Sequence, residues 1–346
     1  MSTHMLEEIK EQPGVIVRTM QQNTATLRDL TENLKRRPVH SIMVAARGTS
    51  NNVAIFAKYF GEYFLGMPVS TAASSIINLY HRRMRLDSVL ILAISQSGEG
   101  PDIMGVVKEA KNQGALTVGI TNHEKSSLAR EVDFPIITGA GPEQSIVATK
   151  TCTASMMAIA SLIQNWSGER DFGAQLEKVP ELLTKIIARE AEIAEKAYLF
   201  KVFEDCVILA RGLNYCAALE TAFKIQETCY LNAQGYSAAD ILHGPIAMLD
   251  DHFSALVYAC QGPSLPGIVG TISRLKQIGI PLLLIANEPA LLNENRLNFQ
   301  IQEEFSEEIM PFASVVFGQI FAYYLAQLKG RNPDFPRRLK KVTQTL

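Results

Sequence analysis

The stretch Val89 to Asn122, VLILAISQSGEGPDIMGVVKEAKNQGALTVGITN, has the pattern of a strand, a turn, a helix, a glycine and a second strand. The same pattern returns at Ala255 to Asn287, ALVYACQGPSLPGIVGTISRLKQIGIPLLLIAN. A shorter repeat stands ahead of each copy, IMVAARG at Ile42 to Gly48 and VILARG at Val207 to Gly212. Self-similarity of this length predicts duplicated α/β units packed against each other, and paired units usually hold a ligand between them.

Apolar runs alternate with helical stretches throughout the first half of the chain. The expected strands are Ser41 to Ala46, a short one after Pro68, Ser88 to Ile94, Leu116 to Thr121 and Phe134 to Ile137. Five strands that alternate with helices predict a doubly wound parallel sheet. We therefore expect an α/β fold of two tandem doubly wound sheets with flanking helices. Its expected segments are an N-terminal helical segment at 1–37, a first subdomain at 38–168, a second at 169–330 and a tail at 331–346.

Composition limits the class of protein. With 47% apolar and 20% charged residues, a chain of 346 residues can bury a large core, which excludes the disordered and fibrous classes. The formal net charge of -2 favours a small-molecule ligand over nucleic acid. We find no signal segment and no apolar stretch of about 18 residues without charge, so we expect a cytoplasmic protein without a membrane span. The five cysteines form no C-x-x-C pair and are expected to be reduced and buried.

The turn Ser95-Gln96-Ser97-Gly98-Glu99 follows an uncharged strand and leads toward the helix expected at Ile103 to Gly114. Hydroxyls and backbone N–H groups near a helix N-terminus favour an anion, and a phosphate monoester would fit. Thr49 and Ser50 follow the neighbouring strand at the same level, where open α/β sheets bind ligands. The alternative is that these hydroxyls are only helix N-caps. Neither G-x-x-x-x-G-K-[ST] nor G-x-G-x-x-G occurs, so we expect a ligand smaller than a nucleotide and no cofactor.

The second copy has Cys260-Gln261-Gly262-Pro263 where the first has its serine-rich turn. Its chemistry lies instead on a helix, where Glu220, Lys224 and Glu227 are spaced i, i+4 and i+7 and so share one face. Proton transfer between C1 and C2 of an open-chain sugar needs a base that reaches both carbons, and a partly buried glutamate suits that task. The alternative is a solvated face of surface ion pairs.

His243 lies in the sequence Leu242-His243-Gly244-Pro245, which predicts a turn. A histidine in such a place suits general acid and base catalysis, although a purely structural role is the alternative. The other histidines are scattered, and neither H-x-H nor H-E-x-x-H nor a Cys/His cluster occurs, so no metal site is expected.

Five motifs in this order resemble the sugar isomerase (SIS) family, and within it the isomerase half of glucosamine-6-phosphate synthase. They are Ala46 to Ser50, Ser95 to Glu99, Val147-Ala148-Thr149-Lys150, Glu220 to Glu227 and Leu242 to Pro245. The similarity extends from about residue 40 to the tail. It implies a homodimer with shared active sites and a sugar-phosphate ligand.

The resemblance also implies a role for each candidate residue. The phosphate would be held by Thr49, Ser50, Ser95, Gln96 and Ser97, with Val147 and Ala148 near the sugar and Lys341 of the tail covering the site. His243 would open the sugar ring, from the neighbouring subunit. Glu227 would move the proton between C1 and C2, and Lys224 matches a lysine that forms a Schiff base with the ketose, which requires a lowered amine pKa.

Two departures from the synthase shape the expected activity. No cysteine precedes Cys152, so we expect no glutaminase domain and no ammonia drawn from glutamine. The turn continues as Gly100-Pro101 where the synthase has a threonine, so one phosphate hydroxyl is missing. Without an ammonia supply the same site is expected to run in the opposite direction. It would convert glucosamine 6-phosphate and water to fructose 6-phosphate and ammonia, as a SIS-type glucosamine-6-phosphate deaminase does.

Three alternatives stay open. A deglycase acting on a fructosamine 6-phosphate would use the same Glu227 and Lys224, and a plain aldose/ketose phosphosugar isomerase would need no nitrogen. A sugar-phosphate sensor is the alternative from another class. Such sensors usually carry a DNA-binding helix-turn-helix, for which the first 40 or so residues are too short and too little basic. The joint presence of Glu220, Lys224, Glu227 and His243 also favours turnover.

Overall fold

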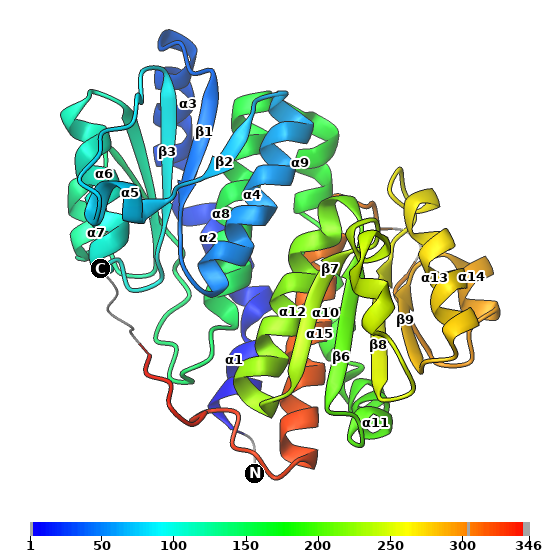
Figure 1. Cartoon of the computed structure of the whole chain (residues 1–346). Coiled ribbons are helices and arrows are strands. Elements are labelled where there is room, and N and C mark those ends of the chain that lie inside the picture. Colours follow the sequence, from blue (N-terminus) through cyan, green and yellow to red (C-terminus); the bar gives the residue numbers. More distant parts are fainter. Residues whose placement is uncertain (1–2, 303–304, 342–346) are drawn as a thin grey trace. The chain divides into compact units, whose positions relative to one another are not determined.

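The computed structural model describes residues 3–302 and 305–341 (Figure 1). The chain divides into two compact units, each built around one sheet. The first-sheet unit comprises residues 14–143, 150–177 and 340–341, and the second-sheet unit comprises 3–13, 144–149, 178–302 and 305–339. These units group segments that are distant in the sequence. The four consecutive segments expected from the sequence are a different kind of division, and they stay a prediction.

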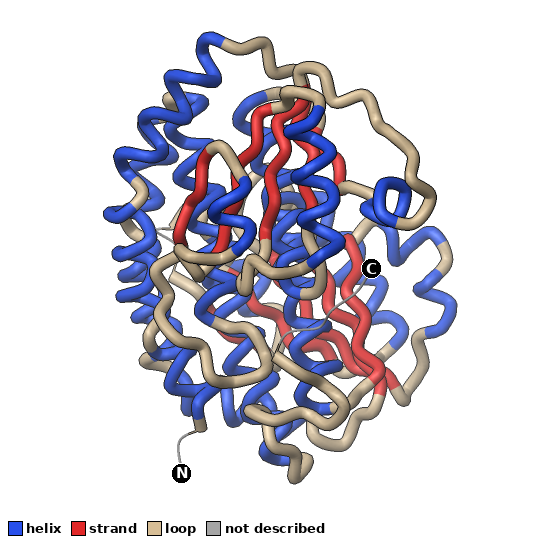
Figure 2. The backbone as a smooth tube through the Cα atoms, turned by 90° about the vertical axis from the view of Figure 1, so that its left-hand side faces the viewer, coloured by secondary structure: helices blue, strands red, loops and turns tan. Residues whose placement is uncertain are grey.

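The first sheet has five parallel strands in the order β2-β1-β3-β4-β5. The strands are β1 (Ser41–Ala45), β2 (Val69–Thr71), β3 (Val89–Ile94), β4 (Leu116–Thr121) and β5 (Phe134–Ile137). The two central strands β3 and β4 are almost wholly buried, as expected where helices cover both faces of a parallel sheet. In Figure 2 the strands of each sheet run side by side with helices around them.

Helices of the first-sheet unit pack in two groups. One group contains α3 (Thr24–Arg36), α4 (Thr49–Leu65) and α8 (Lys150–Ser167), and the other contains α5 (Ser74–Asn78), α6 (Pro101–Asn112) and α7 (Ser127–Glu131). The unit also holds α9 (Arg170–Leu176) and most of α2 (Gln12–Gln22). Because α4 and α6 fall in different groups, the sheet is wound in both directions from β1 and β3, which confirms the doubly wound prediction.

The second sheet repeats the first. Its strands are β6 (Asp205–Ala210), β7 (Asn232–Ser237), β8 (Phe253–Ala259), β9 (Leu282–Ala286) and β10 (Asn298–Gln300), in the order β10-β9-β8-β6-β7, all parallel. Read from β7, this order matches that of the first sheet strand for strand. The internal repeat in the sequence therefore corresponds to a duplicated fold, as predicted.

Helices of the second-sheet unit come from both ends of the chain. They are α1 (His4–Lys10), α10 (Val179–Ile187), α11 (Glu190–Phe200), α12 (Tyr215–Cys229), α13 (Pro266–Ile278), α14 (Pro289–Asn293) and α15 (Met310–Leu328), with short 3-10 helices η1 (Gly212–Asn214), η2 (Asp240–His243) and η3 (Pro245–Met248). The predicted helix at Ile103 begins earlier, at Pro101, because proline suits the first helical position and Gly100 before it is extended.

The expectation that the chain lacks an uncharged apolar stretch of bilayer-spanning length is wrong. Helix α15 has 19 residues without a charged side chain and is long and apolar enough to cross a membrane. However, 83% of its most apolar window is buried within the protein, where it packs against α10, α11 and α12. Gly318 permits close contact with α12, since a Cβ there would lie 2.0 Å from Thr221 Oγ1. Its composition is that of a core helix apolar on all sides.

Candidate functional site

The serine-rich turn after β3 is fixed by backbone hydrogen bonds. Ser95 N donates to Ile120 O at 3.0 Å, and Gly98 N donates to both Ser95 O and Ser95 Oγ at 3.1 Å. Asn122 N donates to Gln96 O at 3.1 Å, and Thr121 Oγ1 donates to the same oxygen at 3.2 Å. The turn is therefore ordered without a ligand. Thr121 and Asn122, which hold Gln96 O, were not singled out in the sequence analysis.

Glycine is required within this turn. Gly98 has φ of +67°, and a Cβ at this position would lie 2.3 Å from Ser126 Oγ. Ser95 is buried and its hydroxyl accepts from Gly98 N, whereas Gln96 and Ser97 are half-buried. Ser95 thus shapes the turn, and Gln96 and Ser97 are better placed to reach a ligand.

The hydroxyl residues do not serve as helix N-caps, so the capping alternative is wrong. The N-cap residues of α4 and α6 are Gly48 and Gly100, which have no side chain. Thr49 and Ser50 instead lie in the first turn of α4, beside the carboxyl end of β1. Because β1 pairs with β3, the two hydroxyl-bearing turns lie at neighbouring strand ends, as predicted.

An ion pair joins the segments on either side of the turn. Arg47 Nε lies 2.6 Å from Asp102 Oδ2, and a guanidinium nitrogen of Arg47 donates to Ser74 Oγ. Asp102 is 3% exposed in the first turn of α6, so this carboxylate already uses the positive end of that helix. The candidate anion site is therefore the turn together with the start of α4, rather than the start of α6.

Glu99 is exposed, and its side chain contacts the start of α7. Its carboxylate accepts from Ser127 Oγ at 2.6 Å and from Ser127 N at 2.9 Å, and these hydrogen bonds hold the pKa of Glu99 below its usual value. The exposed carboxylate is thus engaged at the start of α7.

The three charged residues of α12 form one buried group. Lys224 Nζ lies 3.2 Å from Glu220 Oε1 and 2.5 Å from Glu227 Oε2. The lysine side chain is 0% exposed, that of Glu220 is 2% exposed and that of Glu227 is 18% exposed. The surface ion-pair alternative is therefore wrong, and Glu227 is the most exposed member of the group.

The segment containing Val147 and Ala148 is held by acidic and amide side chains. The Glu8 carboxylate of α1 accepts from Gln144 N and Ser145 N, and Gln319 Nε2 of α15 donates to Thr149 O at 3.2 Å. Val147 is fully buried and Ala148 is half-buried. Ala148 is thus the more accessible of the two.

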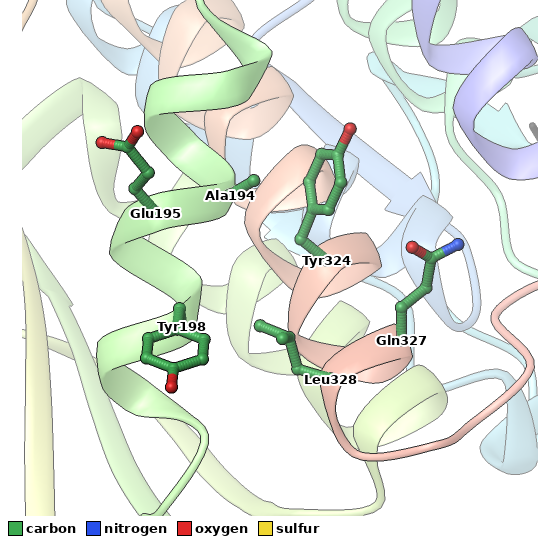
Figure 3. Close-up of a pocket in the computed structure, with 6 residues that line it drawn as sticks. All are labelled: Ala194, Glu195, Tyr198, Tyr324, Gln327 and Leu328. Atoms are coloured by element: carbon green, nitrogen blue, oxygen red, sulfur yellow. The ribbon is translucent and has the colours of Figure 1, made fainter.

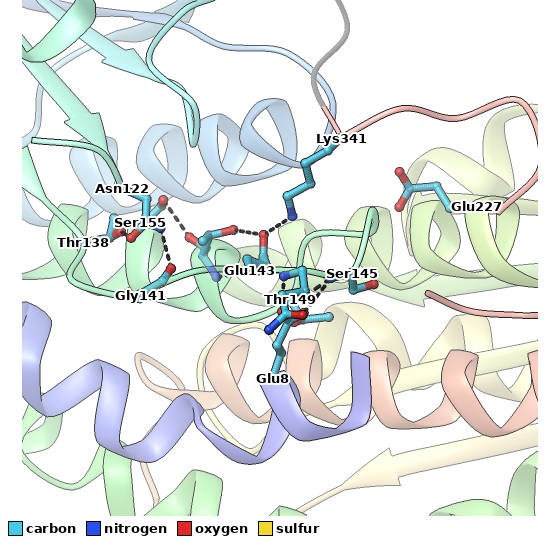
Figure 4. A network of polar contacts seen from close by, with 12 residues as sticks. Glu8, Asn122, Thr138, Gly141, Glu143, Ser145, Thr149, Ser155, Glu227 and Lys341 are labelled. Carbon is cyan, nitrogen blue, oxygen red and sulfur yellow. Dashed lines mark hydrogen bonds and ion pairs between the residues drawn. The ribbon is translucent and has the colours of Figure 1, made fainter. Parts of the chain in front are cut away.

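Lys341 binds a buried carboxylate. Its Nζ lies 2.7 Å from Glu143 Oε2, and Glu143 also accepts from Thr151 N at 3.1 Å and Thr151 Oγ1 at 2.8 Å (Figure 4). The Glu143 side chain is 0% exposed, so Lys341 places a positive charge beside a buried carboxylate. Whether Lys341 also covers a ligand stays a prediction, and residues 342–346 lie outside the described residues.

His243 ends the 3-10 helix η2, where the sequence predicted a turn, and its side chain is exposed. The next residue, Gly244, has φ of +143°, which a glycine tolerates. An exposed imidazole is available to solvent or to another molecule.

The second copy fills its own turn with a carboxylate. Glu307 Oε2 accepts from Ser264 N at 3.3 Å, and a Cβ at Gly262 would lie 2.1 Å from the same oxygen. A Cβ at Gly212 would lie 3.2 Å from Glu307 Oε1, so this carboxylate lies against both turns that correspond to those of the first copy. Burial raises the pKa of Glu307. The second copy thus places its own carboxyl group at this turn, where the first copy has the half-buried side chains of Gln96 and Ser97, and the sequence carried no sign of this.

The five cysteines are buried, as predicted. Burial raises the pKa of Cys229 to about 12 and raises the pKa of Cys206, Cys216 and Cys260 as well. Among the described residues, a group of three possible metal ligands, Asp250, Asp251 and His252, lies together in the turn before β8. All three are exposed, and such surface groups are common without a metal ion.

The SIS domain family model matches residues 35–164 and 204–329, which include both sheets. The chain belongs to the SIS domain family. A glutamine--fructose-6-phosphate aminotransferase [isomerizing] of Aquifex aeolicus is 33% identical over 341 residues, which is 98% of this SIS chain and 57% of the relative. The SIS chain therefore spans little more than half the length of this curated relative.

Solved structures give the same fold. The C-terminal domain of glucosamine-fructose-6-phosphate aminotransferase from Francisella tularensis has a TM-score of 0.87 and 26% identity, covering 97% of this SIS chain and 99% of that domain. A putative phosphosugar isomerase from Silicibacter pomeroyi also has a TM-score of 0.87, with 28% identity, and covers 96% of the SIS chain and 100% of its own. The resemblance inferred from five motifs is confirmed.

Proposed function

We propose that this SIS chain is a glucosamine-6-phosphate deaminase, which converts glucosamine 6-phosphate and water to fructose 6-phosphate and ammonia. The observation that carries the proposal is the buried group of Glu220, Lys224 and Glu227 on α12. Burial of a lysine and two carboxylates costs desolvation free energy, and apolar residues would pack α12 against α15 at least as well. Such a group is typical of a site whose chemistry needs a base and an amine.

The phosphate of the substrate is assigned to the turn after β3 and the start of α4. Gln96, Ser97, Thr49 and Ser50 supply half-buried polar side chains there, and the turn is already fixed by Asn122. Preorganised donors bind a phosphate without a further ordering cost. The name of the Aquifex aeolicus relative includes fructose 6-phosphate, which supports a hexose 6-phosphate as the ligand.

Glu227 is assigned the proton transfer. Once the sugar ring is open, the base removes the proton from C2 of the amino aldose and returns it to C1, which leaves a ketimine at C2. Water adds to C2 of the ketimine, ammonia leaves, and fructose 6-phosphate remains. Glu227 suits this step because it is the partly exposed member of the group and can meet a substrate.

Lys224 and Glu220 are assigned to the same step. An amine must lose a proton before it attacks carbon, and Glu227 at 2.5 Å is close enough to receive it. Lys224 could then displace ammonia from the ketimine to form its own Schiff base, which water hydrolyses. Glu220, at 3.2 Å, orients the lysine throughout.

Ring opening is assigned to His243, acting from a second copy of the chain. The imidazole is exposed on η2, which suits a group that must reach a neighbouring molecule. This part of the proposal implies a homodimer with shared active sites, in which neither copy is active alone.

The experiment is an ammonia-release assay with glucosamine 6-phosphate, with fructose 6-phosphate followed in parallel. We expect equal amounts of both products from the wild type, and a turnover about 10²- to 10⁴-fold lower from Glu227→Gln. Glu195→Gln, an exposed glutamate on α11, is the matched control and should keep wild-type turnover.

Other outcomes would replace the proposal. Isomerisation of a hexose 6-phosphate without ammonia would make the chain a phosphosugar isomerase. Release of an amino acid from a fructosamine 6-phosphate in preference to ammonia would make it a deglycase. Tight binding of sugar phosphates without turnover would make it a sensor.

A further inference from the structure

A strongly basic pocket lies in the second-sheet unit, apart from the residues assigned to catalysis. It has a volume of about 500 Å³ and lies where α11, α12 and α15 end and the segment after α15 begins. Lys201, Lys329, Arg331 and Arg337 line it, opposed by the single carboxylate of Glu204. Four cationic side chains with one carboxylate make an unusually dense positive charge for a chain whose net charge is -2.

The one acidic residue does not neutralise the pocket. Glu204 lies 2.7 Å from Lys329 Nζ, but its side chain is 74% exposed, so water screens this pair. The carboxyl ends of α11, α12 and α15 add about half a negative charge each. The lining stays positive after both contributions, since its four cationic side chains outnumber the one carboxylate and the partial charges of the helix ends.

The two arginines are ordered by one aromatic ring. The guanidinium carbons of Arg331 and Arg337 lie 5.3 Å and 4.4 Å from the centre of the Tyr230 ring, within the range of cation–π attraction. Arg337 N also donates to Tyr230 Oη at 2.8 Å. Two guanidinium groups gathered at one ring repel each other, and an anion bound beside them would relieve that repulsion.

The shape of the pocket favours a small molecule. Its volume falls within the range of ligand sites, roughly 300–1,000 Å³. An apolar pocket of similar volume adjoins it, lined by Ala194, Glu195, Tyr198, Tyr324, Gln327 and Leu328 (Figure 3). Leu328 lines both pockets, and Lys201 Nζ lies 3.8 Å from the centre of the Tyr198 ring. A ligand whose charged group binds in the basic pocket can thus extend its organic part into the apolar pocket.

We propose that this basic pocket binds a small phosphorylated molecule, with its phosphate or diphosphate against Arg331 and Arg337. Arginine is suited to this ligand because its planar guanidinium group donates two parallel hydrogen bonds to phosphate oxygens. Tyr230 directly follows α12, three residues after Glu227, so a ligand here contacts the end of the helix that carries the proposed base. The binding site itself does not depend on the proposed function.

The test uses inorganic pyrophosphate as the probe, titrated calorimetrically into the full chain at low ionic strength. We expect wild-type binding that weakens with added salt, because charges near the surface are screened. Arg331→Gln and Arg337→Gln should each raise the dissociation constant about tenfold or more, the change expected for one lost charged hydrogen bond. Arg274→Gln, an exposed arginine on α13, is the matched control and should bind as the wild type does.

Peptide mapping identifies where the probe binds. Phenylglyoxal modifies accessible arginines, and pyrophosphate should protect Arg331 and Arg337 but leave Arg274 reactive. Two pocket variants are used because one of them could disturb the fold, which circular dichroism would reveal. Pyrophosphate binding that both pocket variants leave unchanged would overturn the proposal, as would a wild type that does not bind the probe. Either result would leave the ammonia-release assay unaffected.

Discussion

Replacement of Lys224 by methionine tests the buried charged group on α12 directly. Methionine keeps most of the volume of the lysine but removes its charge, so Glu220 and Glu227 lose the cation that lies 3.2 Å and 2.5 Å from their carboxylates. Glu220 is 2% exposed, so water can replace little of that lost interaction. Loss of one partner from a buried ion pair costs about 3–5 kcal/mol of unfolding free energy, and we expect Lys224→Met to fall in this range.

The expected change is large enough to measure by thermal or urea unfolding. For a unit of this size, a loss of about 3–5 kcal/mol lowers the melting temperature by roughly 6–20 °C. The double variant Lys224→Met/Glu220→Gln should recover more than about 1 kcal/mol of unfolding free energy relative to Lys224→Met, because it also removes the charge of a buried carboxylate.

A surface pair provides the control for this prediction. Lys276 lies 3.8 Å from Glu294, and its side chain is 37% exposed. Lys276→Met makes the same chemical change in the same unit and should cost less than about 1 kcal/mol. If Lys224→Met unfolds within about 1 kcal/mol of the wild type, Lys224 is not buried between carboxylates and the physical basis of the site is refuted.

Three further predictions concern other parts of the protein. Gly98→Ala should destabilise the first-sheet unit by about 1–3 kcal/mol and abolish sugar-phosphate binding, because residue 98 has a positive φ and the new Cβ would clash with Ser126 Oγ. Unchanged sugar-phosphate binding, measured by calorimetry, would contradict this prediction. Glu307 has a raised pKa in the folded state, so the wild type and Glu307→Gln should be equally stable at acidic pH. As the pH rises past 4.5, the wild type should lose stability relative to the variant. A difference between their urea unfolding midpoints that stays the same at every pH would disprove this. An equal mixture of inactive Glu227→Gln and His243→Asn chains, unfolded and refolded together, should regain about a quarter of wild-type turnover if each site uses both copies, whereas a mixture that stays inactive argues against shared sites.

The sheets were predictable from the sequence because their signal is local. Strands such as β3 and β4 are uncharged runs bounded by a turn and a glycine, and buried parallel strands favour such runs. The repeat between Val89 to Asn122 and Ala255 to Asn287 then fixed the number of sheets. The doubly wound arrangement followed from the alternation of strands with helices, whereas the order of the strands was not predicted from the sequence.

The candidate site was predictable only in part. The shared face of Glu220, Lys224 and Glu227 follows from helical spacing, but their burial depends on tertiary packing around α12, which contacts α15, β6 and β7. The sequence likewise gave no reason to connect Glu307 with Gly262, because the contact joins a loop before α15 to a turn after β8. Helix α15 itself escaped notice, since an uncharged run with tyrosines and glutamines has the composition of a core helix and of a membrane span alike.

The fate of the C2 hydrogen tests the proposed chemistry most directly. Glucosamine 6-phosphate deuterated at C2 is incubated with the wild type and with Glu227→Gln, and the label is followed by NMR while ammonia is measured. We predict that the wild type moves the deuterium from C2 to C1 or to solvent as ammonia appears, and that Glu227→Gln binds the sugar phosphate with similar affinity but leaves the label at C2. Movement of the label at the wild-type rate in Glu227→Gln would show that Glu227 is not the base.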